Sequence, residues 1–253
     1  MKHTEHYKIK WHDTDASRTL QPSRLLAYMQ ETANLHLLST GKSLDTLRDE
    51  NGLAFLLSRM SVRVYVPLSA YEEIDVETSI CESRGLGFQR CFRILRGDTV
   101  AAEAFSIWAL LDLNEKKLLP ATAFPYQIEP DPSLDASFLA RVRFPAAAQM
   151  EQAGERKIVY SDIDYNGHMN NTHYPNMLCD FTPGIERKKV KGFTLSFLHE
   201  AAYGHTLKIL RAPREDGYFF RTVDEAGTVC LEATLTLADT EGLEAVSSVG
   251  AEA

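Results

Sequence analysis

The order of elements predicted along the chain repeats once, and this repeat limits the fold more than any other feature. In the first half, residues 21–41 have the apolar spacing of a helix, with Pro22 in the first turn and Gly41 as the C-terminal cap. Strand-like segments rich in β-branched and aromatic residues follow it, at 61–66, 74–80, 88–95 and 99–113. The second half repeats this order, with a shorter helix over 172–181 and strands at 193–198, 206–212, 218–223 and 229–238. The sequence therefore predicts an α+β protein of two similar units, each an antiparallel sheet wrapped around a helix.

A proline-rich stretch separates the two halves. Five of the ten prolines fall between residues 112 and 158, where the regular apolar patterning also weakens, which is typical of a linker. The predicted organisation is a first unit over 1–125, a linker over 126–152, a second unit over 153–240 and a frayed tail over 241–253. A single α+β domain, whose similar segments are a coincidence, remains the alternative.

Composition argues against several classes of protein. The formal net charge of -8 disfavours a nucleic-acid binder, because binding to phosphates needs a concentrated positive surface. The four cysteines are far apart and form no CxxC pair, so neither a zinc site nor a disulfide framework is indicated. There is no apolar targeting segment at the start and no run of about 18 apolar residues. We therefore expect a cytoplasmic protein with reduced thiols, neither secreted nor membrane-spanning.

The segment DIDYNGHMNN, residues 162–171, allows a calcium-binding interpretation. Its first six residues fit the opening of an EF-type loop, DxDxNG. Position 12 of that loop would be His173, whereas calcium requires a bidentate carboxylate there. The residues before it, ERKIVYS, also have the pattern of a strand rather than of an entering helix. A calcium-binding or interaction module is therefore the weaker interpretation.

The same segment also has the spacing of an active site. In an extended chain, Asp164, Asn166 and His168 would project from one face and bring together a carboxylate, an amide and an imidazole. A helix must begin close to Pro175, and its free N–H groups could stabilise a carbonyl oxygen that gains negative charge. Glu200 ends an apolar strand-like run and would be a poorly solvated acid if that strand is central. Each residue also has an ordinary structural interpretation, as a surface carboxylate, a turn cap or a helix start.

Taken together, these segments resemble the acyl-acyl carrier protein thioesterase family. DIDYNGHMNNTHY resembles the family's DxDxNxHxNNxxY segment, and LSFLHEAAYGHTL resembles its second signature, in which an apolar strand leads to a glutamate. The resemblance is to the short bacterial type and implies two tandem hot-dog units and no cofactor or metal. Two residues depart from the family pattern: Ala201 stands where many plant members have cysteine, and Pro175 stands where a residue other than proline is usual.

The resemblance implies an activity, the hydrolysis of fatty acyl-acyl carrier protein to free fatty acid, with Asp164, Asn166, His168 and Glu200 as the catalytic set. Glu200 or His168 would activate water, and Asn166 with helix N–H groups would hold the carbonyl oxygen. Asp164 would orient its neighbours, and direct attack by Asp164 through an anhydride is the alternative. Residues expected to contact the substrate are Asn170, Asn171, Leu26, Met29 and Ala33.

An acidic carrier protein needs a local basic area on this acidic chain. The candidate residues are Arg187, Lys188, Lys189 and Lys191, although a solvated loop is an equally simple interpretation. Hydrolysis of acyl-CoA and hydration of enoyl thioesters remain alternative activities, and the sequence leaves acyl chain length and oligomeric state, including a homodimer, open. The first half has Ser17, Thr19 and Pro67 at the places of Asn166, His168 and Glu200, so we expect one site per chain.

Overall fold

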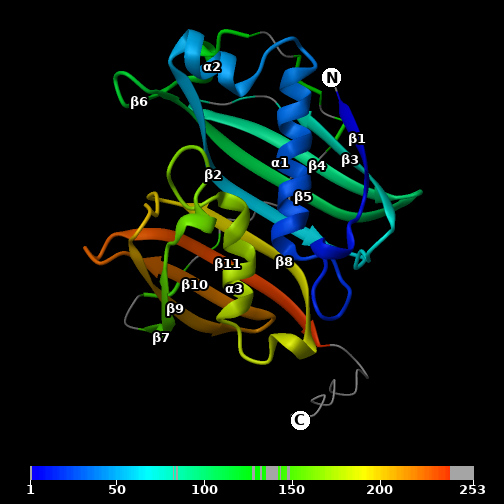
Figure 1. Cartoon of the computed structure of the whole chain (residues 1–253), viewed down its shortest axis with the longest axis vertical. Helices are drawn as coiled ribbons and strands as arrows, with labels where there is room; N and C mark the ends of the chain where they lie inside the picture. Colours follow the sequence, from blue (N-terminus) through cyan, green and yellow to red (C-terminus); the bar gives the residue numbers. More distant parts are fainter. Residues whose placement is uncertain are drawn as a thin grey trace.

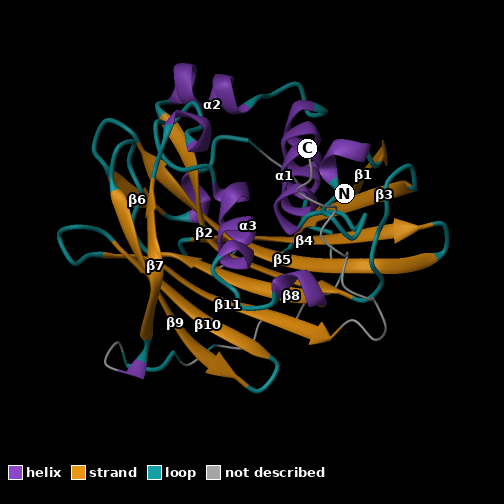
Figure 2. Cartoon of the chain, turned by 60° about the horizontal axis from the view of Figure 1, so that its bottom comes forward, coloured by secondary structure: helices purple, strands orange, loops and turns teal. Residues whose placement is uncertain are grey.

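Helices lie on one side of a single curved antiparallel sheet (Figures 1 and 2). This computed structural model describes residues 2–81, 83, 85–126, 129–131, 133–134, 142, 144–146 and 149–239. Within these residues the sheet has 11 strands in the order β1-β3-β4-β5-β2-β8-β11-β10-β9-β7, with β6 pairing β5. The predicted tail lies outside the described residues, as does much of the predicted linker. The predicted α+β class, with two units of helix and sheet, is confirmed.

The elements of the first unit occupy the first half of the chain. They are β1 (His3–Lys8), α1 (Pro22–Leu38), α2 (Leu44–Asn51), β2 (Leu53–Val64), β3 (Glu73–Ile80), β4 (Gly87–Arg96), β5 (Thr99–Asp112) and β6 (Lys117–Leu119). The second unit repeats the pattern with β7 (Glu151–Lys157), α3 (Tyr174–Asp180), β8 (Lys188–Phe197), β9 (Thr206–Arg214), β10 (Gly217–Val223) and β11 (Val229–Asp239). In both units an edge strand and a helix precede the strands that curve around that helix.

The two units join edge to edge through β2 and β8, which pair antiparallel at the middle of the sheet. Gly192 on β8 allows this close approach, because a Cβ there would lie 2.5 Å from the backbone oxygen of Val62. The main apolar core crosses the junction and contains Leu26 and Met29 of α1 together with Met177 of α3. Burying side chains of this size stabilises the fold by about 1.5–3 kcal/mol each. The helices of both units therefore share one core.

The first unit differs from the sequence prediction at β2, at β1, at α2 and at the short strand β6, which was not predicted. β2 starts at Leu53 rather than at Ser61, because a register shift between Leu57 and Arg59 interrupts the alternation on which the prediction depended. β1 was not predicted, since its sequence HTEHYK is almost entirely polar. The helix α2 was also missed, although it has an N-terminal capping serine and a left-handed glycine directly after its last turn.

Candidate active site

The turn that contains His168 is closed by its own backbone. The N–H of Asp164 donates to the carbonyl of His168 (3.1 Å), and the N–H of Gly167 donates to the carbonyl of Asp164 (3.0 Å). Gly167 adopts a φ of 83°, which glycine tolerates better than other residues. The prediction of an extended segment, with alternate side chains on one face, is therefore wrong. The turn, rather than strand alternation, sets the directions of Asp164, Asn166 and His168.

Asp164 stabilises the turn from inside. Its Oδ1 accepts a hydrogen bond from the backbone N–H of Asn166 at 2.8 Å. A carboxylate bonded to a backbone N–H two residues later is a common device for fixing tight turns. Asp164 thus shapes the loop on which Asn166 and His168 are presented.

The turn is attached to the segment that follows β8. The N–H of Met169 donates to the carbonyl of Ala201 (2.9 Å), and His168 forms a β-bridge with Ala202. These backbone contacts bring His168 next to Glu200, with 2.9 Å between the imidazole Nε2 and the carboxylate Oε2. Two residues that are far apart in the sequence therefore form one imidazole–carboxylate pair.

Glu200 is more exposed than the sequence suggested. Its side chain is 57% exposed, because it lies past Phe197, the last residue of β8, where the sheet no longer covers it. The expectation of a poorly solvated acid is therefore wrong. The pair of His168 and Glu200 is open to water, which a hydrolytic reaction requires.

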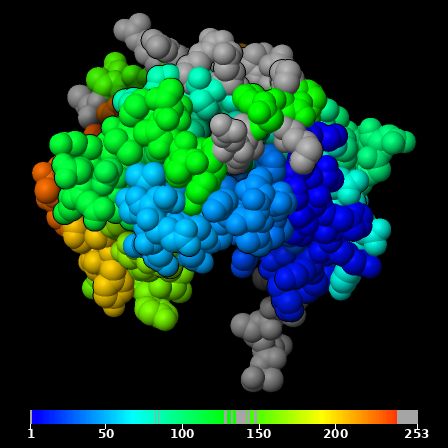
Figure 3. All heavy atoms as spheres, turned by 90° about the horizontal axis from the view of Figure 1, so that it is seen from above, coloured from blue at the N-terminus to red at the C-terminus, as the bar shows by residue number. Residues whose placement is uncertain are grey.

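Asn166 contacts the other unit of the chain. Its side-chain oxygen accepts a hydrogen bond from Nη1 of Arg48, on α2, at 3.2 Å. The same guanidinium lies over the ring of Tyr165, 5.2 Å from the ring centroid. Seen from above, α2 is on the surface beside the second unit (Figure 3). The sequence analysis did not identify Arg48. The capping residues Ser43 and Gly52 could have predicted the helix that carries it, but no sequence signal indicates its contact with Asn166.

The two asparagines that follow the turn start the next helix. The Oδ1 of Asn170 accepts hydrogen bonds from the N–H (2.9 Å) and the hydroxyl (2.8 Å) of Thr172. A single-turn 3-10 helix, η5 (Asn171–His173), then leads into α3. Pro175 falls in the first turn of α3, where no intrahelical N–H is needed, so this departure from the family pattern fits the local geometry.

Asp162, the first ligand position of the calcium interpretation, has a structural role instead. It is buried, and its Oδ1 lies 2.5 Å from a guanidinium nitrogen of Arg156 while its Oδ2 accepts the N–H of Val159 at 3.0 Å. Because the positively charged guanidinium of Arg156 occupies Oδ1 of Asp162, this oxygen is not free to bind a calcium ion. Among the described residues, no group of three or more His, Cys, Asp and Glu side chains is placed to hold a metal ion. The calcium interpretation thus has no support in the geometry of this segment.

The predicted substrate-contacting residues of α1 lie in the interior. Leu26 and Met29 are fully buried, and Ala33 is half-buried against the same core. They lie in the first unit, whereas the pair of His168 and Glu200 lies in the second. Their predicted contact with an acyl chain remains a prediction.

The predicted docking residues lie at the opposite end of β8 from Glu200. The strand from Lys188 to Phe197 covers roughly 30 Å at about 3.3 Å per residue. Lys188 also pairs with Asp239 at 2.9 Å, and Lys191 donates to the backbone oxygen of Tyr65 at 3.2 Å. The structure therefore does not bring this basic segment close to the imidazole–carboxylate pair.

Two cysteines lie in the second unit, Cys230 buried and Cys179 partly buried against the core. Burial raises the pKa of Cys179, on α3, to about 12 and the pKa of Cys230, on β11, to about 11. The Sγ of Cys230 is 3.9 Å from the backbone oxygen of Glu200, a proximity that the sequence did not indicate. Both thiols are protonated at neutral pH, so neither has the character of a nucleophile.

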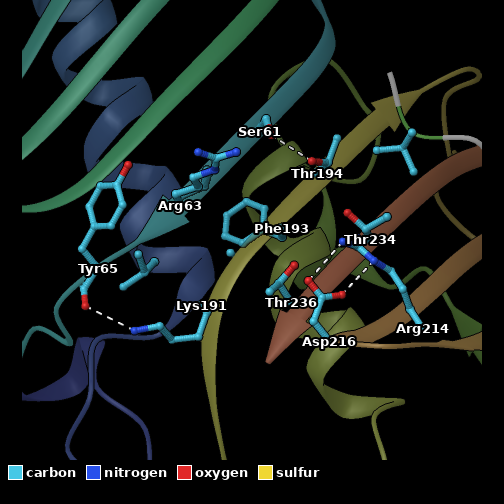
Figure 4. A pocket seen from close by; sticks show the side chains of 14 residues that line it. Ser61, Arg63, Tyr65, Lys191, Phe193, Thr194, Arg214, Asp216, Thr234 and Thr236 are labelled. Carbon is cyan, nitrogen blue, oxygen red and sulfur yellow. Dashed lines mark hydrogen bonds and ion pairs between the residues drawn. The ribbon is translucent and has the colours of Figure 1, made fainter. Parts of the chain in front are cut away.

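A separate cleft of about 330 Å³ lies where β2, β8 and β11 meet (Figure 4). Its polar lining includes the hydroxyl pair Ser61–Thr194 (2.8 Å) and the ion pair Arg214–Asp216 (2.8 Å). Ser61 alternates along β2 with the core residues Met60 and Val62, so the cleft opens on the sheet face that points away from α1. It is distinct from the site of His168 and Glu200.

Two similar halves of one curved sheet, joined through β2 and β8 and each holding a helix, are the architecture of a double hot-dog protein. Two family models match the chain, the acyl-ACP thioesterase N-terminal domain over residues 1–123 and the acyl-ACP thioesterase C-terminal domain over residues 146–239. The chain therefore belongs to the acyl-ACP thioesterase family.

The curated relatives of the chain include thioesterases named for acyl carrier protein and for CoA substrates. The chain is 25% identical to a chloroplastic palmitoyl-acyl carrier protein thioesterase of Arabidopsis thaliana over 82% of its length but spans only 54% of that relative. It is 24% identical to an acyl-CoA thioesterase of Haemophilus influenzae over 48% of its length and 88% of that protein.

Among solved structures, an acyl-ACP thioesterase from Bacteroides thetaiotaomicron superposes with a TM-score of 0.80 at 21% identity, covering 94% of this chain and 98% of that chain. The 12:0-ACP thioesterase from Umbellularia californica gives a TM-score of 0.78 at 16% identity with the same coverage. At these identities the likeness shows the fold. In the part of the chain that the structure describes, no helix combines the length and apolarity needed to cross a bilayer.

Proposed function

We propose that this protein hydrolyses the thioester of fatty acyl-acyl carrier protein and releases free fatty acid. The observation that carries the proposal is the 2.9 Å contact between Nε2 of His168 and Oε2 of Glu200, which two backbone contacts hold in place. Membership of the acyl-ACP thioesterase family supports the choice of substrate. The protein then ends acyl chain elongation by removing the chain from its carrier.

In the proposed mechanism Glu200 is the general base. His168 donates its Nε2–H to the carboxylate and keeps it oriented, while the second carboxylate oxygen of the exposed Glu200 accepts a proton from water. The oxygen of that water bonds to the thioester carbonyl carbon, and the amide NH₂ of Asn166 donates to the carbonyl oxygen as it gains negative charge. The carbon–sulfur bond then breaks, and the leaving sulfur takes the proton. Because a free thiol has a pKa of about 8.5, this last step needs little acid assistance.

Attack by Asp164 itself is the alternative route, and it would form a mixed anhydride. Asp164 Oδ1 accepts the N–H of Asn166, so in the anhydride route the second carboxylate oxygen would be the one that attacks. Single turnover in oxygen-18 water separates the two. The water route places the label only in the fatty acid, whereas an anhydride that water opens at the Asp164 carboxyl carbon places it in the Asp164 carboxylate, so label in Asp164 would establish the anhydride route.

The experiment that tests the function compares matched substrates. The purified protein is given acyl chains of increasing length, each on acyl carrier protein and on CoA, while release of thiol and of fatty acid is measured. We expect faster hydrolysis of the carrier-protein thioesters, with chain length setting the rate. Faster hydrolysis of the CoA thioesters would favour the second candidate, an acyl-CoA thioesterase, which the likeness of half of the chain to the Haemophilus influenzae enzyme makes worth testing. Absence of hydrolysis of both would overturn the proposal, and hydration of an enoyl thioester would replace it.

A further inference from the structure

We infer that Arg48, on α2 of the first unit, is a positioning residue that holds the side-chain amide of Asn166 with its NH₂ directed toward the substrate carbonyl. This inference rests on the proposed function, because it concerns the group that stabilises the oxyanion. It makes the single site of the chain a joint product of both units, although the first unit contributes none of the four predicted catalytic residues.

The chemistry of the contact determines which way the amide faces. An asparagine side chain has one end that accepts hydrogen bonds and another that donates them, and the two ends have nearly the same shape. A guanidinium only donates, so the 3.2 Å contact with Arg48 is satisfied only when the oxygen of Asn166 faces α2. The NH₂ group is then turned away from α2. A thioester oxygen that gains negative charge needs a donor, and the contact with Arg48 selects the donor end for it.

Arg48 is itself fixed by a second contact with the same turn. Its guanidinium lies 5.2 Å from the centroid of the Tyr165 ring, which is a cation–π distance. One guanidinium therefore contacts two consecutive residues. It lies over the ring of Tyr165 and donates an N–H to the side-chain oxygen of Asn166. These two contacts restrict both the side chain of Asn166 and the exposed tip of the turn.

The helix that carries Arg48 is anchored at both ends and in the middle. The hydroxyl of Ser43 accepts the N–H of Thr46 (3.0 Å) at the N-terminus, and Gly52 ends the helix with a φ of 67°. Leu47, next to Arg48, is fully buried in a cluster with Leu53 and Leu110. Because α2 is held in this way, Arg48 is presented from a rigid element, as a positioning group requires.

The corresponding turn of the first unit is organised differently. The hydroxyl of Ser17, at the place of Asn166, donates to Oδ1 of Asp15 at 2.7 Å and so is satisfied within its own turn. The arginine of that turn, Arg18, lies over the ring of Trp11, 5.9 Å from its centroid, and not over a partner from the other unit. Arg48 of the first unit thus contacts the turn of the second unit, which has Asn166 and His168, whereas Arg18 contacts Trp11 within its own unit.

A double-mutant cycle tests this role. We expect Arg48→Ala to lower kcat by roughly 10- to 100-fold, less than loss of the oxyanion donor itself, with KM nearly unchanged. Arg48→Lys, which restores a donor, should recover part of the loss. In an Asn166→Ala background, Arg48→Ala should have no further effect, because its partner is gone. Lys42→Ala is the matched control: Lys42 precedes the same helix and lies over the ring of Tyr126, 5.2 Å from its centroid, so kcat should be retained.

Other outcomes would overturn the inference. If the loss from Arg48→Ala persists in the Asn166→Ala background, or is a salt-dependent rise in KM, then Arg48 binds the carrier instead of positioning Asn166. The same cycle is measured by thermal unfolding, which needs no activity. Non-additive shifts in Tm for Arg48→Ala and Asn166→Ala would support the contact even if the wild-type protein hydrolysed no thioester, in which case only the proposed function would fail. Additive shifts would contradict the contact itself.

Discussion

The two turns that precede the helices have one backbone design but different side chains. In the first, the N–H of Asp15 donates to the carbonyl of Thr19 at 2.8 Å, just as that of Asp164 donates to His168 at 3.1 Å in the second. Residues with positive φ occupy the same place, Arg18 at 62° and Gly167 at 83°.

Each turn also donates a backbone hydrogen bond to the segment that follows a central strand, β2 in the first unit and β8 in the second. Leu20 donates to the carbonyl of Leu68 at 2.7 Å, and Met169 donates to that of Ala201 at 2.9 Å. This correspondence places Pro67 where the second unit has Glu200.

The comparison teaches that the scaffold and the chemistry are separable. The backbone contacts are present in both units, so they serve the fold. The amide, the imidazole and the carboxylate are present in one, so they are the residues from which catalysis is expected. The first unit forms the same turn with Ser17 and Thr19 at the places of Asn166 and His168. The fold therefore does not need an amide or an imidazole there.

The largest expected effect separates Glu200 from its counterpart. Glu200→Gln keeps the size of the side chain but removes the base, and we expect kcat to fall by roughly 100- to 10,000-fold. Pro67→Ala in the first unit should leave kcat close to wild type. Steady-state hydrolysis of a fatty acyl-acyl carrier protein thioester measures both effects, and circular dichroism is the control for folding. A comparable loss from Pro67→Ala would show that both units take part in the reaction.

A second comparison concerns the two helices. Met29 on α1 and Met177 on α3 are both fully buried in the shared core. Replacing either with alanine should lower the free energy of unfolding by about 2–5 kcal/mol. Only Met29→Ala should alter the preferred acyl chain length, because the first unit is the one predicted to shape the acyl pocket. Denaturant unfolding and product analysis check the two parts, and a change in chain length from Met177→Ala alone would assign the pocket to the second unit.

The positive-φ residues of the two turns give a third test. Gly167→Ala places a Cβ in the left-handed region, and although that Cβ would contact nothing within 4 Å, the backbone strain should cost about 1–2 kcal/mol of stability. Arg18→Gly removes the same strain but adds freedom to the unfolded chain, so its net effect should stay below about 1 kcal/mol. Thermal unfolding compares the two. Equal losses would mean that the turns do not share a backbone design.

The two thiols of the second unit, Cys179 and Cys230, should be unreactive. Since burial raises the pKa of Cys179 to about 12 and that of Cys230 to about 11, both remain protonated at neutral pH. Iodoacetamide should therefore leave activity intact in the native protein and label these positions only after unfolding, as peptide mass spectrometry will reveal. Rapid inactivation that tracks labelling of Cys230 would restore a nucleophilic-cysteine mechanism.

The smallest expected effect belongs to the basic segment of the second unit. Reversing Lys188 and Lys189 to glutamate should raise KM for acyl-carrier protein by roughly two- to fivefold at low salt, an effect on the scale of a surface ion pair. The effect should disappear at high salt because exposed charges are screened. The distance of this segment from Glu200 along β8 limits the expectation. An unchanged KM at low salt would remove the segment from the docking surface.

The fold was predictable because its signals are local and repeated. Apolar periodicity and β-branched runs predicted α1 and most strands, and the repeat predicted two units, although α1 ends at Leu38 with Ser39 as its cap rather than at the predicted Gly41. β1 and α2 were missed because their sequences are polar, and each depends on contacts with its neighbours: β1 pairs with β3, and Leu47 of α2 is buried against Leu53 and Leu110.

The site was predictable only in part. The resemblance to the acyl-acyl carrier protein thioesterase family implied that His168 and Glu200 belong to one site, and the structure places them 2.9 Å apart. The exposure of Glu200 and the positions of Cys230 and Arg48 depend on tertiary packing, since β8 ends before Glu200 and both β11 and α2 approach from elsewhere in the chain. No local pattern contains that information.

The most direct test of a single site per chain is the rate of one turnover in two folded variants. His168→Ala and Thr19→Ala remove side chains at corresponding places in turns with the same backbone contacts. With enzyme in excess over the fatty acyl-acyl carrier protein substrate, rapid quenching measures the rate of the chemical step without the contribution of product release. We predict that His168→Ala slows this step by roughly 100-fold or more while Thr19→Ala leaves it unchanged. Equal slowing in the two variants would contradict the assignment of catalysis to the second unit.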